Sequence, residues 1–406
     1  MPPTDGLFSP RFFLMCGFTF TVFLSAFQLL PTAPFHILEL GGSTFASGLF
    51  LGFLTYASAF SAPLTGALVD RAGQRRLLIT TSLALAVFSL AYAVITDYRI
   101  MLALVIVHGC FWSGLLSASA AYLTGMLPER RRAEGIAYWG LSSVAAIAVA
   151  PTVGFWIYHL GWLWLCVACA GLNLVMTAIA WSLSDHVRPA TDPPPRARAR
   201  PRGLLEWRVL IVSLSLFLYS FGYGGITSFT ALYADANGVT PKSIYLTTLA
   251  LVILVTRPVS GRLGDRWGYK QVFAPCLVLI TIGLACLAFG GSRNWMIASA
   301  AIFGVGFGTA YPVYVAYVMQ DVGPERRGAA FGAILAAFDT GIGTGSTTMG
   351  WLIQEYGFAA AFGTAATLSG LALPYFLLAD RALRRPAPGV SSRFSDPEAQ
   401  SQNIEI

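Results

Sequence analysis

SAPLTGALVDRAG at residues 61–73 returns as TRPVSGRLGDRWG at residues 256–268, at an offset of 195. A shorter repeat follows in each case, since PERR stands at 128–131 and again at 324–327. Repeats in the same order at nearly equal offsets, 195 and 196 residues, indicate a duplicated structural unit. The sequence therefore predicts two related halves that share one orientation.

The segments around these repeats are too apolar for a soluble domain. Hydrophobic residues make up 56% of the 406 positions, and charged residues only 11%. A bilayer core about 30 Å thick requires about 20 mostly apolar residues per spanning helix, and twelve runs of that kind occur. They lie near 11–36, 45–69, 77–96, 100–126, 134–158, 161–183, 207–233, 243–264, 271–290, 295–320, 328–353 and 358–379. The predicted fold class is an all-α integral membrane protein with 12 transmembrane helices in two pseudo-symmetric six-helix bundles.

The placement of positive charge predicts the orientation of these helices. Cytoplasmic loops carry an excess of Lys and Arg. With the N-terminus inside, all but three of the 26 Lys and Arg residues fall on the cytoplasmic side, the exceptions being Arg99, Lys242 and Arg293. We expect both termini in the cytoplasm. The formal charge of +7 then serves orientation and contact with anionic lipid headgroups, and no nucleic-acid partner is needed to explain it.

The chain divides where its composition changes. Residues 184–206 contain Pro and Arg at a density that can neither enter lipid nor form a core, so we predict a cytoplasmic linker there. The predicted domains are an N-terminal bundle at 1–183, the linker at 184–206, a C-terminal bundle at 207–380 and a cytoplasmic tail at 381–406.

The first repeat matches a family signature, G-x-x-x-D-R-x-G-R-R, in all but one position. Matching residues are Gly66, Asp70, Arg71, Gly73 and Arg75, while Gln74 departs from the pattern and Arg76 follows directly as a second arginine of the motif loop. The second copy keeps Gly261, Asp265, Arg266 and Gly268, with Lys270 at its end. In these residues the chain resembles the major facilitator superfamily, and in particular its bacterial 12-helix drug and metabolite efflux permeases. The resemblance implies the fold of that family, a bacterial inner membrane location and a gating role for both copies.

The chemistry of the motif supports that role. Glycines permit a tight turn and close helix approach, and a carboxylate is stabilised beside an opposing helix N-terminus. The family resemblance implies that Asp70 holds the two halves together in one access state, near the start of helix 11 at about Gly328. A topology anchor in a positively charged loop is the alternative.

Two further signatures are incomplete. In helix 4, Val105 stands where the family often has an arginine, three residues before His108. Many exporters carry a glycine-proline and paired-glycine motif in helix 5. Here its places are taken by Ala146, Ala150, Pro151, Gly154 and Phe155. The small residues and the proline remain, which favours export mildly.

Three ionisable residues fall at membrane depth, where each such group is a functional candidate. Asp339 lies near the predicted bilayer centre, and a lone carboxyl group there can serve proton coupling or contact a cationic substrate. Arg257 lies deep in helix 8 and can face the same cavity or snorkel to the headgroups. His108 in helix 4 suits proton exchange. Structural hydrogen bonds are the alternative for Asp339 and His108.

By analogy with the family, helices 1, 4, 7 and 10 would line a central cavity. The candidate lining residues on these helices are Gln28, Trp112, Tyr219, Tyr223, Tyr311 and Tyr314. Aromatic side chains there would suit flat or apolar solutes. Packing or interfacial anchoring is the alternative reading of each one.

These features predict a monomeric secondary transporter that works by alternating access. The partners we expect are a small-molecule substrate, protons and the lipid bilayer. Export of drug-like compounds or metabolites in exchange for protons is the predicted function, and proton-coupled import of a sugar, organic acid or other nutrient is the alternative. Neither a nucleotide-binding loop nor clustered metal ligands occur, so we expect no enzyme activity, no cofactor and no metal.

Overall fold

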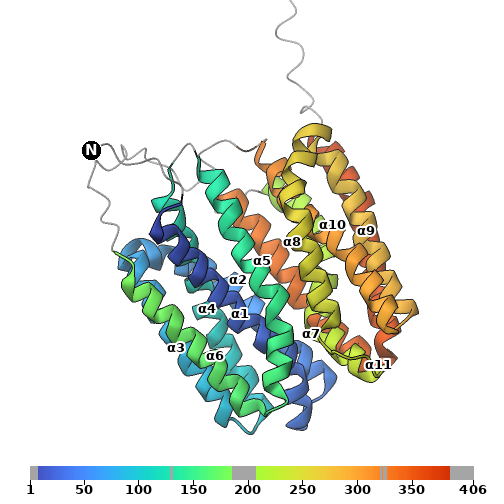
Figure 1. Cartoon of the computed structure of the whole chain (residues 1–406). Coiled ribbons are helices and arrows are strands. Elements are labelled where there is room, and N and C mark those ends of the chain that lie inside the picture. The colour runs from blue at the N-terminus through green and yellow to red at the C-terminus, as the bar shows by residue number, and fades with distance from the viewer. Residues whose placement is uncertain (1–7, 129–130, 185–206, 321, 323–326, 385–406) are drawn as a thin grey trace, which may run out of the picture.

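The structure is a computed structural model that describes residues 8–128, 131–184, 207–320, 322 and 327–384, and these residues form an all-helical fold (Figure 1). The helices are α1 (Pro10–Glu39), α2 (Thr44–Ala72), α3 (Gln74–Val94), α4 (Tyr98–Met126), α5 (Arg132–Tyr158), α6 (Trp162–Ser182), α7 (Trp207–Ala236), α8 (Ile244–Trp267), α9 (Tyr269–Phe289), α10 (Arg293–Gln320) and α11 (Arg327–Arg384).

The long helix α11 is two membrane spans joined by a sharp break. Gly357 has φ 82° and ψ 174°, which is not helical and is open to glycine alone among the common residues. Gly161 has a similar backbone between α5 and α6, with φ 118° and ψ 153°. The break in α11 thus repeats the turn before the last helix of the first half, and it falls between the predicted spans 328–353 and 358–379.

Helix boundaries follow from local chemistry. Ser9 caps α1 by accepting a hydrogen bond from the Phe12 amide at 3.2 Å, and Ser43 caps α2 by accepting one from the Ala46 amide at 3.1 Å. At the matching α2–α3 and α8–α9 turns, Gly73 and Gly268 both have φ 88°.

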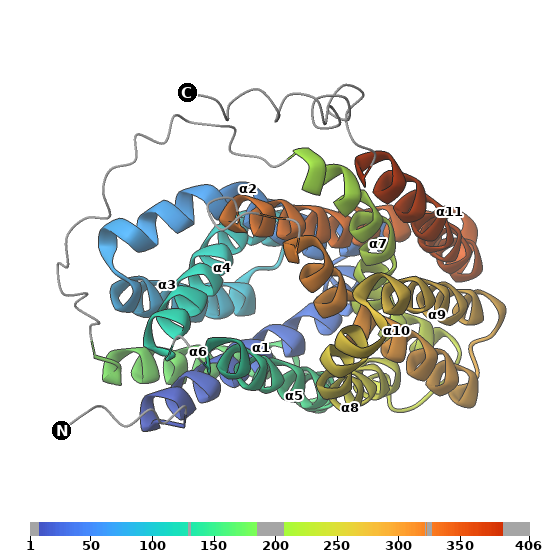
Figure 2. The same ribbon diagram turned by 90° about the horizontal axis from the view of Figure 1, so that it is seen from above.

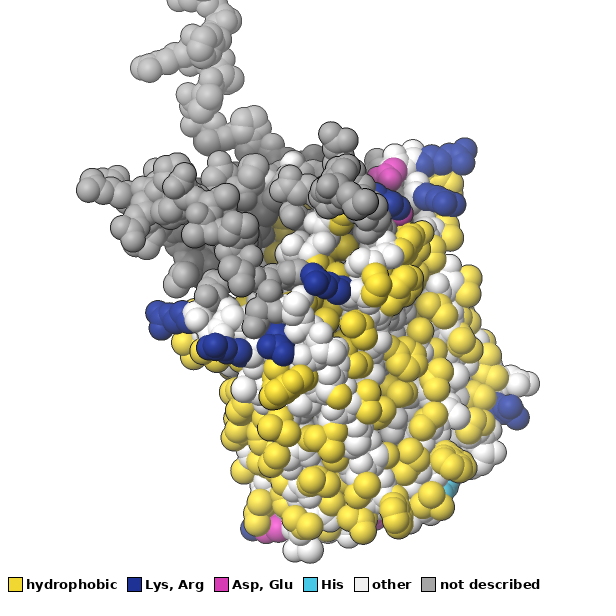
Figure 3. Space-filling model, turned by 60° about the vertical axis from the view of Figure 1, so that its left-hand side comes forward, with side chains coloured by type: hydrophobic (Ala, Val, Ile, Leu, Met, Phe, Trp, Pro, Cys, Tyr) yellow, Lys and Arg dark blue, Asp and Glu magenta, His cyan; other side chains and the backbone are white. Residues whose placement is uncertain are grey.

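The outer surface of the bundle is apolar. Among the described residues, ten helical stretches are long and apolar enough to cross a membrane, and Ile244–Ser260 is a shorter apolar helix. Figure 3 shows hydrophobic side chains over the flank of the molecule, with Lys and Arg gathered mainly toward one end. Large apolar side chains such as Phe60 and Phe289 are 80% and 85% exposed, which suits contact with lipid and not with water.

Each half has its own hydrophobic core. Helices α1–α6 bury one cluster, which includes Met15, Phe18 and Tyr92, and α7–α11 bury another, which includes Phe273 and Phe303. The two halves meet along α2 with α11, α5 with α8 and α1 with α7 (Figures 1 and 2). The predicted all-α membrane fold with two six-helix bundles is confirmed.

The predicted domain boundaries stay predictions. Most of the predicted linker and tail, at 185–206 and 385–406, lies outside the described residues. In the described part of the chain, α6 ends at Ser182 and α7 begins at Trp207.

Candidate transport cavity

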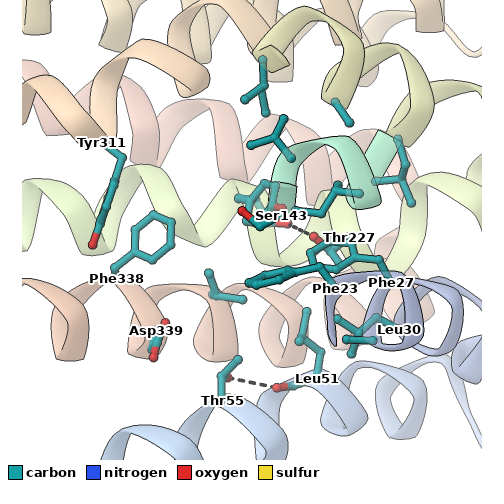
Figure 4. Close-up of a pocket in the computed structure, with 18 of the residues that line it drawn as sticks. Phe23, Phe27, Leu30, Leu51, Thr55, Ser143, Thr227, Tyr311, Phe338 and Asp339 are labelled. Atoms are coloured by element: carbon teal, nitrogen blue, oxygen red, sulfur yellow. Dashed lines mark hydrogen bonds between the residues drawn. The ribbon is translucent and has the colours of Figure 1, made fainter. Parts of the chain in front are cut away.

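A cavity of about 370 Å³ lies between the two halves. Its wall comes from α1, α2, α4 and α5 on one side and from α7, α8, α10 and α11 on the other, and Figure 4 draws part of this lining. This volume falls in the range that accommodates a small organic molecule.

Most of the wall is aromatic and aliphatic. On the N-terminal side, the Phe23 ring lies 6.1 Å from Phe27 and 6.0 Å from Trp112. On the C-terminal side, Tyr223 stacks on Phe307 at 4.3 Å between ring centroids. Such a surface favours flat, apolar solutes over strongly hydrated ones.

Asp339 and Arg257 both line this cavity. Within the described part of the chain they form no salt bridge with one another. Tyr311 lies within electrostatic range of both groups, and Tyr223 within range of Arg257. In Figure 4, Asp339, Phe338 and Tyr311 gather at one end of the cavity, and the Phe338 and Tyr311 rings are 5.0 Å apart.

His108 also reaches the cavity wall but is engaged by its own half. Its Nδ1 lies 3.1 Å from the Tyr92 hydroxyl, and its ring stacks on Phe88 with centroids 5.5 Å apart. Only 8% of His108 is exposed. This geometry favours a structural hydrogen bond, the alternative that the sequence left open.

The six predicted lining residues divide evenly. Trp112, Tyr223 and Tyr311 line the cavity, whereas the other three are packed elsewhere. Gln28 is buried where α1 packs on α5 at Gly154. Tyr219 packs among the Phe273, Phe307 and Phe338 rings, and Tyr314 shares a hydrogen bond with Ser213 at 3.0 Å.

Much of the wall lies on helices other than 1, 4, 7 and 10, the four that the family analogy assigned to the cavity. Helices α2, α5, α8 and α11 contribute Thr55, Ser143, Leu249 and Phe338, and α7 adds Thr227. Apolar lining residues resemble lipid-facing ones in sequence. The wall also contains three Ser or Thr side chains, Thr55, Ser143 and Thr227. Each shares its helix with other Ser or Thr residues, so the sequence carried no signal that singles them out.

One end of the cavity is closed by contacts between the halves. Ser346 donates a hydrogen bond to the Gly48 carbonyl at 2.8 Å, and Tyr56 pairs with Thr344 at 2.7 Å. The Phe45 amide donates to Gln354 Oε1 at 3.2 Å. These contacts join the first half of α2 to the middle of α11.

A second contact between the halves lies at the same end, where α5 meets α8. Thr152 is 3.0 Å from both the Ser243 and the Thr247 hydroxyl. Toward the opposite end, a methyl group added at Gly66 on α2 or at Gly332 on α11 would meet no atom within 4 Å. Among the described residues, the halves therefore form hydrogen bonds with one another at one end of the cavity and none at the other, which is called the separated end below.

The two loop motifs lie at the separated end. Arg75 Nη2 donates to the Trp181 carbonyl at 2.6 Å. In the second copy, Tyr269 donates to Asp265, and Lys270 pairs with Asp380, which also accepts a hydrogen bond from Tyr317. Arg71, Arg76 and Arg266 are exposed.

The predicted contact of Asp70 near Gly328 falls outside the described residues, because neither side-chain environment is described. In the part of the chain that is described, no group of three or more His, Cys, Asp or Glu side chains could hold a metal ion.

Comparison with known proteins supports the resemblance. The family model described as Major Facilitator Superfamily matches residues 14–244 and 212–401. An uncharacterized MFS-type transporter of Pseudomonas aeruginosa is 27% identical over 382 residues, covering 91% of this chain and 93% of that protein. A similar protein of Burkholderia mallei is 24% identical, covering 88% and 89%.

Solved structures share the fold. A bacterial homolog of the human lysosomal transporter Spinster, in an inward-facing and occupied conformation, superposes with a TM-score of 0.79 at 14% identity and covers 93% of this chain and 98% of that chain. A mutant of the nucleoside transporter NupG gives 0.73 at 14% identity, with 92% and 100% covered.

Proposed function

Because this chain belongs to the Major Facilitator Superfamily and is therefore a multi-pass membrane transporter, we propose that it moves small, largely apolar molecules by proton-coupled alternating access. The cavity between the halves is the proposed binding site. Its size and aromatic wall support this assignment.

Two rigid halves around one cavity support alternating access. Each half keeps its own core, so the halves can rock without unfolding either one. In the described part of the chain, hydrogen bonds close the cavity where α2 begins, and the end toward which α2 runs, beside Gly66, is the open one. In the predicted topology the open end faces the cytoplasm.

Asp339 is the observation on which the proposed proton coupling rests. It lines the cavity, and the described residues offer it neither an ion pair nor a hydrogen bond. A carboxyl group in apolar surroundings favours its neutral form, and water or a nearby cation favours the ionised form. Opening and closing of the cavity would change that environment, and a proton could be taken up on one side and released on the other.

Export in exchange for protons is the direction that the helix α5 sequence favours. Pro151 stands inside α5, and Gly154 packs closely on α1 at Gln28. These residues preserve part of the motif that many exporters of the family carry. The substrates would be drug-like compounds or metabolites.

Uptake together with protons is a second candidate, and the charge of the cavity favours it. Arg257 is a cation in the wall without an ion-pair partner among the described residues. A positive group in an apolar cavity attracts anions, which suits an organic acid.

The direction can be tested with cells and vesicles. Cells with and without the protein are compared on a panel of toxic compounds, and those with altered effect are then followed in vesicles under an imposed pH gradient. We expect gradient-driven accumulation that Asp339→Asn abolishes and Asp339→Glu partly retains. Glu355→Gln, an exposed position on the same helix, serves as the matched control. If the Asp339→Asn protein accumulated the compound as well as the unchanged protein does, the proposed proton coupling through Asp339 would be contradicted.

A further inference from the structure

The ionisable side chains of the cavity wall come from five helices. They are His108 on α4, Tyr223 on α7, Arg257 on α8, Tyr311 on α10 and Asp339 on α11, while α1, α2 and α5 contribute none to the described lining. His108 is occupied by Tyr92. The charge that a bound molecule meets is therefore set by Arg257 and Asp339.

Arg257 needs an anion that the described part of the chain does not supply. Its guanidinium makes no salt bridge and donates no hydrogen bond to the described residues, and the Tyr311 and Tyr223 hydroxyls lie within its electrostatic range. Guanidinium keeps its proton under all physiological conditions. A partly buried cation without a counterion is costly, so a bound anion would gain much of that energy.

Asp339 does not fill this role. It forms no ion pair with Arg257, and Tyr311 is the residue in electrostatic range of both. A carboxyl group can also become neutral by taking a proton, which arginine cannot do. When Asp339 is protonated, the charged side chains of the described lining leave a net positive charge.

We propose that the substrate is an organic anion, with a carboxylate held by Arg257 and an apolar, ring-sized body packed against the aromatic wall. Two guanidinium N–H groups match the two oxygens of a carboxylate, which adds geometric selectivity. The stacked Tyr223–Phe307 pair and the Phe338 ring offer flat surfaces for the body. A volume of about 370 Å³ suits one small aromatic acid better than a lipid with two long chains.

The proposal fixes the sign of proton coupling. A proton on Asp339 removes a negative charge that would repel an anion in the same cavity, so the proton and the anion strengthen each other's binding, and the effect is reciprocal. A proton and an anion that bind together also travel together. An inward proton gradient then drives uptake. The proposal therefore favours uptake together with protons over export in exchange for protons.

Equilibrium binding to the full-length protein in detergent tests the proposal. Three probes share one naphthalene body and differ in charge: the carboxylate, the carboxamide and the aminomethyl compound. We expect the carboxylate to bind at least about tenfold more tightly than the amide, as a charge-assisted bidentate contact predicts. The amine is expected to bind most weakly.

Variants of Arg257 identify the group responsible. Arg257→Gln should remove the preference for the carboxylate, and Arg257→Lys should keep part of it, because the charge remains while the fork is lost. Arg262→Gln, an exposed position on the same helix, should leave all three affinities unchanged. Melting curves of each variant establish that it is folded.

The pH dependence tests the role of Asp339. Between about pH 8 and pH 5.5 an aromatic carboxylate stays ionised, and its affinity should rise as the pH falls. Asp339→Asn should keep the affinity high and independent of pH. Tighter binding of the amine, equal binding of all three probes, or no carboxylate binding to folded protein would overturn the anion assignment.

This inference rests on the proposed function, yet the two can fail separately. The binding test needs no gradient. Proton-driven transport without carboxylate preference would overturn only the substrate class. Carboxylate binding in a protein that shows no gradient-driven transport would overturn only the proposed coupling.

Discussion

His108 shows how a buried ionisable residue can be committed to structure. Its ring lies between the Tyr92 hydroxyl and the Phe88 face. We predict that His108→Phe lowers the free energy of unfolding by about 1–3 kcal/mol, since it leaves the buried Tyr92 hydroxyl without its partner. Transport should keep its pH dependence.

A matched variant, Tyr92→Phe, separates packing from hydrogen bonding. Combining it with His108→Phe should cost less than the sum of the two single changes, because both remove the same contact. Melting in detergent measures the stability, and a pH profile of transport in vesicles measures coupling. If folded His108→Phe lost the pH dependence of transport, His108 would instead have a role in proton transfer.

For single residues, the sequence predicted which side chains are functional candidates better than it predicted where those side chains lie. Asp339, Arg257 and His108 stood out because charge is rare in these spans, and all three line the cavity. Aromatic residues are common in these spans, so their presence alone did not indicate which of them line the cavity. Tyr311 and Tyr314 lie three positions apart on α10, yet one faces the cavity and the other the core of its half. Helix rotation decides between them, and it is set by packing.

Among the elements, the α2–α3 turn separates two uses of glycine in one motif. Gly73 has φ 88° and ψ 144°, a backbone that other residues adopt only at a cost. Gly66 is helical and has open space beside it. We predict that Gly73→Ala destabilises the protein by about 1–3 kcal/mol.

Gly66→Ala should leave stability equal or slightly higher, because alanine favours a helix. If the motif closes against α11 in the other access state, Gly66→Ala should still slow transport. Melting curves and initial transport rates of the two variants provide the measurement. A stable Gly66→Ala protein with unchanged rate would argue that the motif is a topology anchor.

Helices themselves were largely predictable. All twelve predicted spans fall on helices, and the gap at residues 354–357 coincides with the break at Gly357. Apolar run length and the cost of unpaired backbone in lipid are local properties, which the sequence carries directly. The effect of helix bends on the cavity wall depends less on local sequence. Proline stands directly after Arg257 on α8 and after Tyr311 on α10, yet its effect on the wall depends on neighbouring helices.

For the whole molecule, the closed end provides the test of alternating access. Phe45 and Gln354 lie in opposite halves and are in contact. We predict that a cleavable thiol cross-linker between Phe45→Cys and Gln354→Cys stops transport, and that cleavage restores it. The reason is that opening this end must separate the two residues. Native cysteines are replaced first.

A pair within one half provides the control. Tyr158 donates a hydrogen bond to Glu39 at 2.6 Å inside the N-terminal bundle. Cross-linking Tyr158→Cys to Glu39→Cys should leave transport active, because each half moves as a unit. Full activity with the Phe45–Gln354 link in place would contradict a rocking mechanism.

Which end is closed could not be predicted from the sequence. Two access states share one set of helices, and their difference lies in long-range contacts such as Ser346 with Gly48. Those contacts join small and hydroxyl residues, whose pairing leaves no periodic signal. The duplicated halves, by contrast, were predictable because both copies of the motif survive.

The hydroxyl contacts at the closed end set how readily it separates. Ser346, Tyr56 and Thr152 make them with neutral partners in the opposite half. Entering water molecules can replace each bond at nearly equal energy, so these bonds themselves add little to the free-energy cost of parting. Dissolved salt should hardly alter the speed of that step, because no ionic attraction among these three contacts is there to be screened.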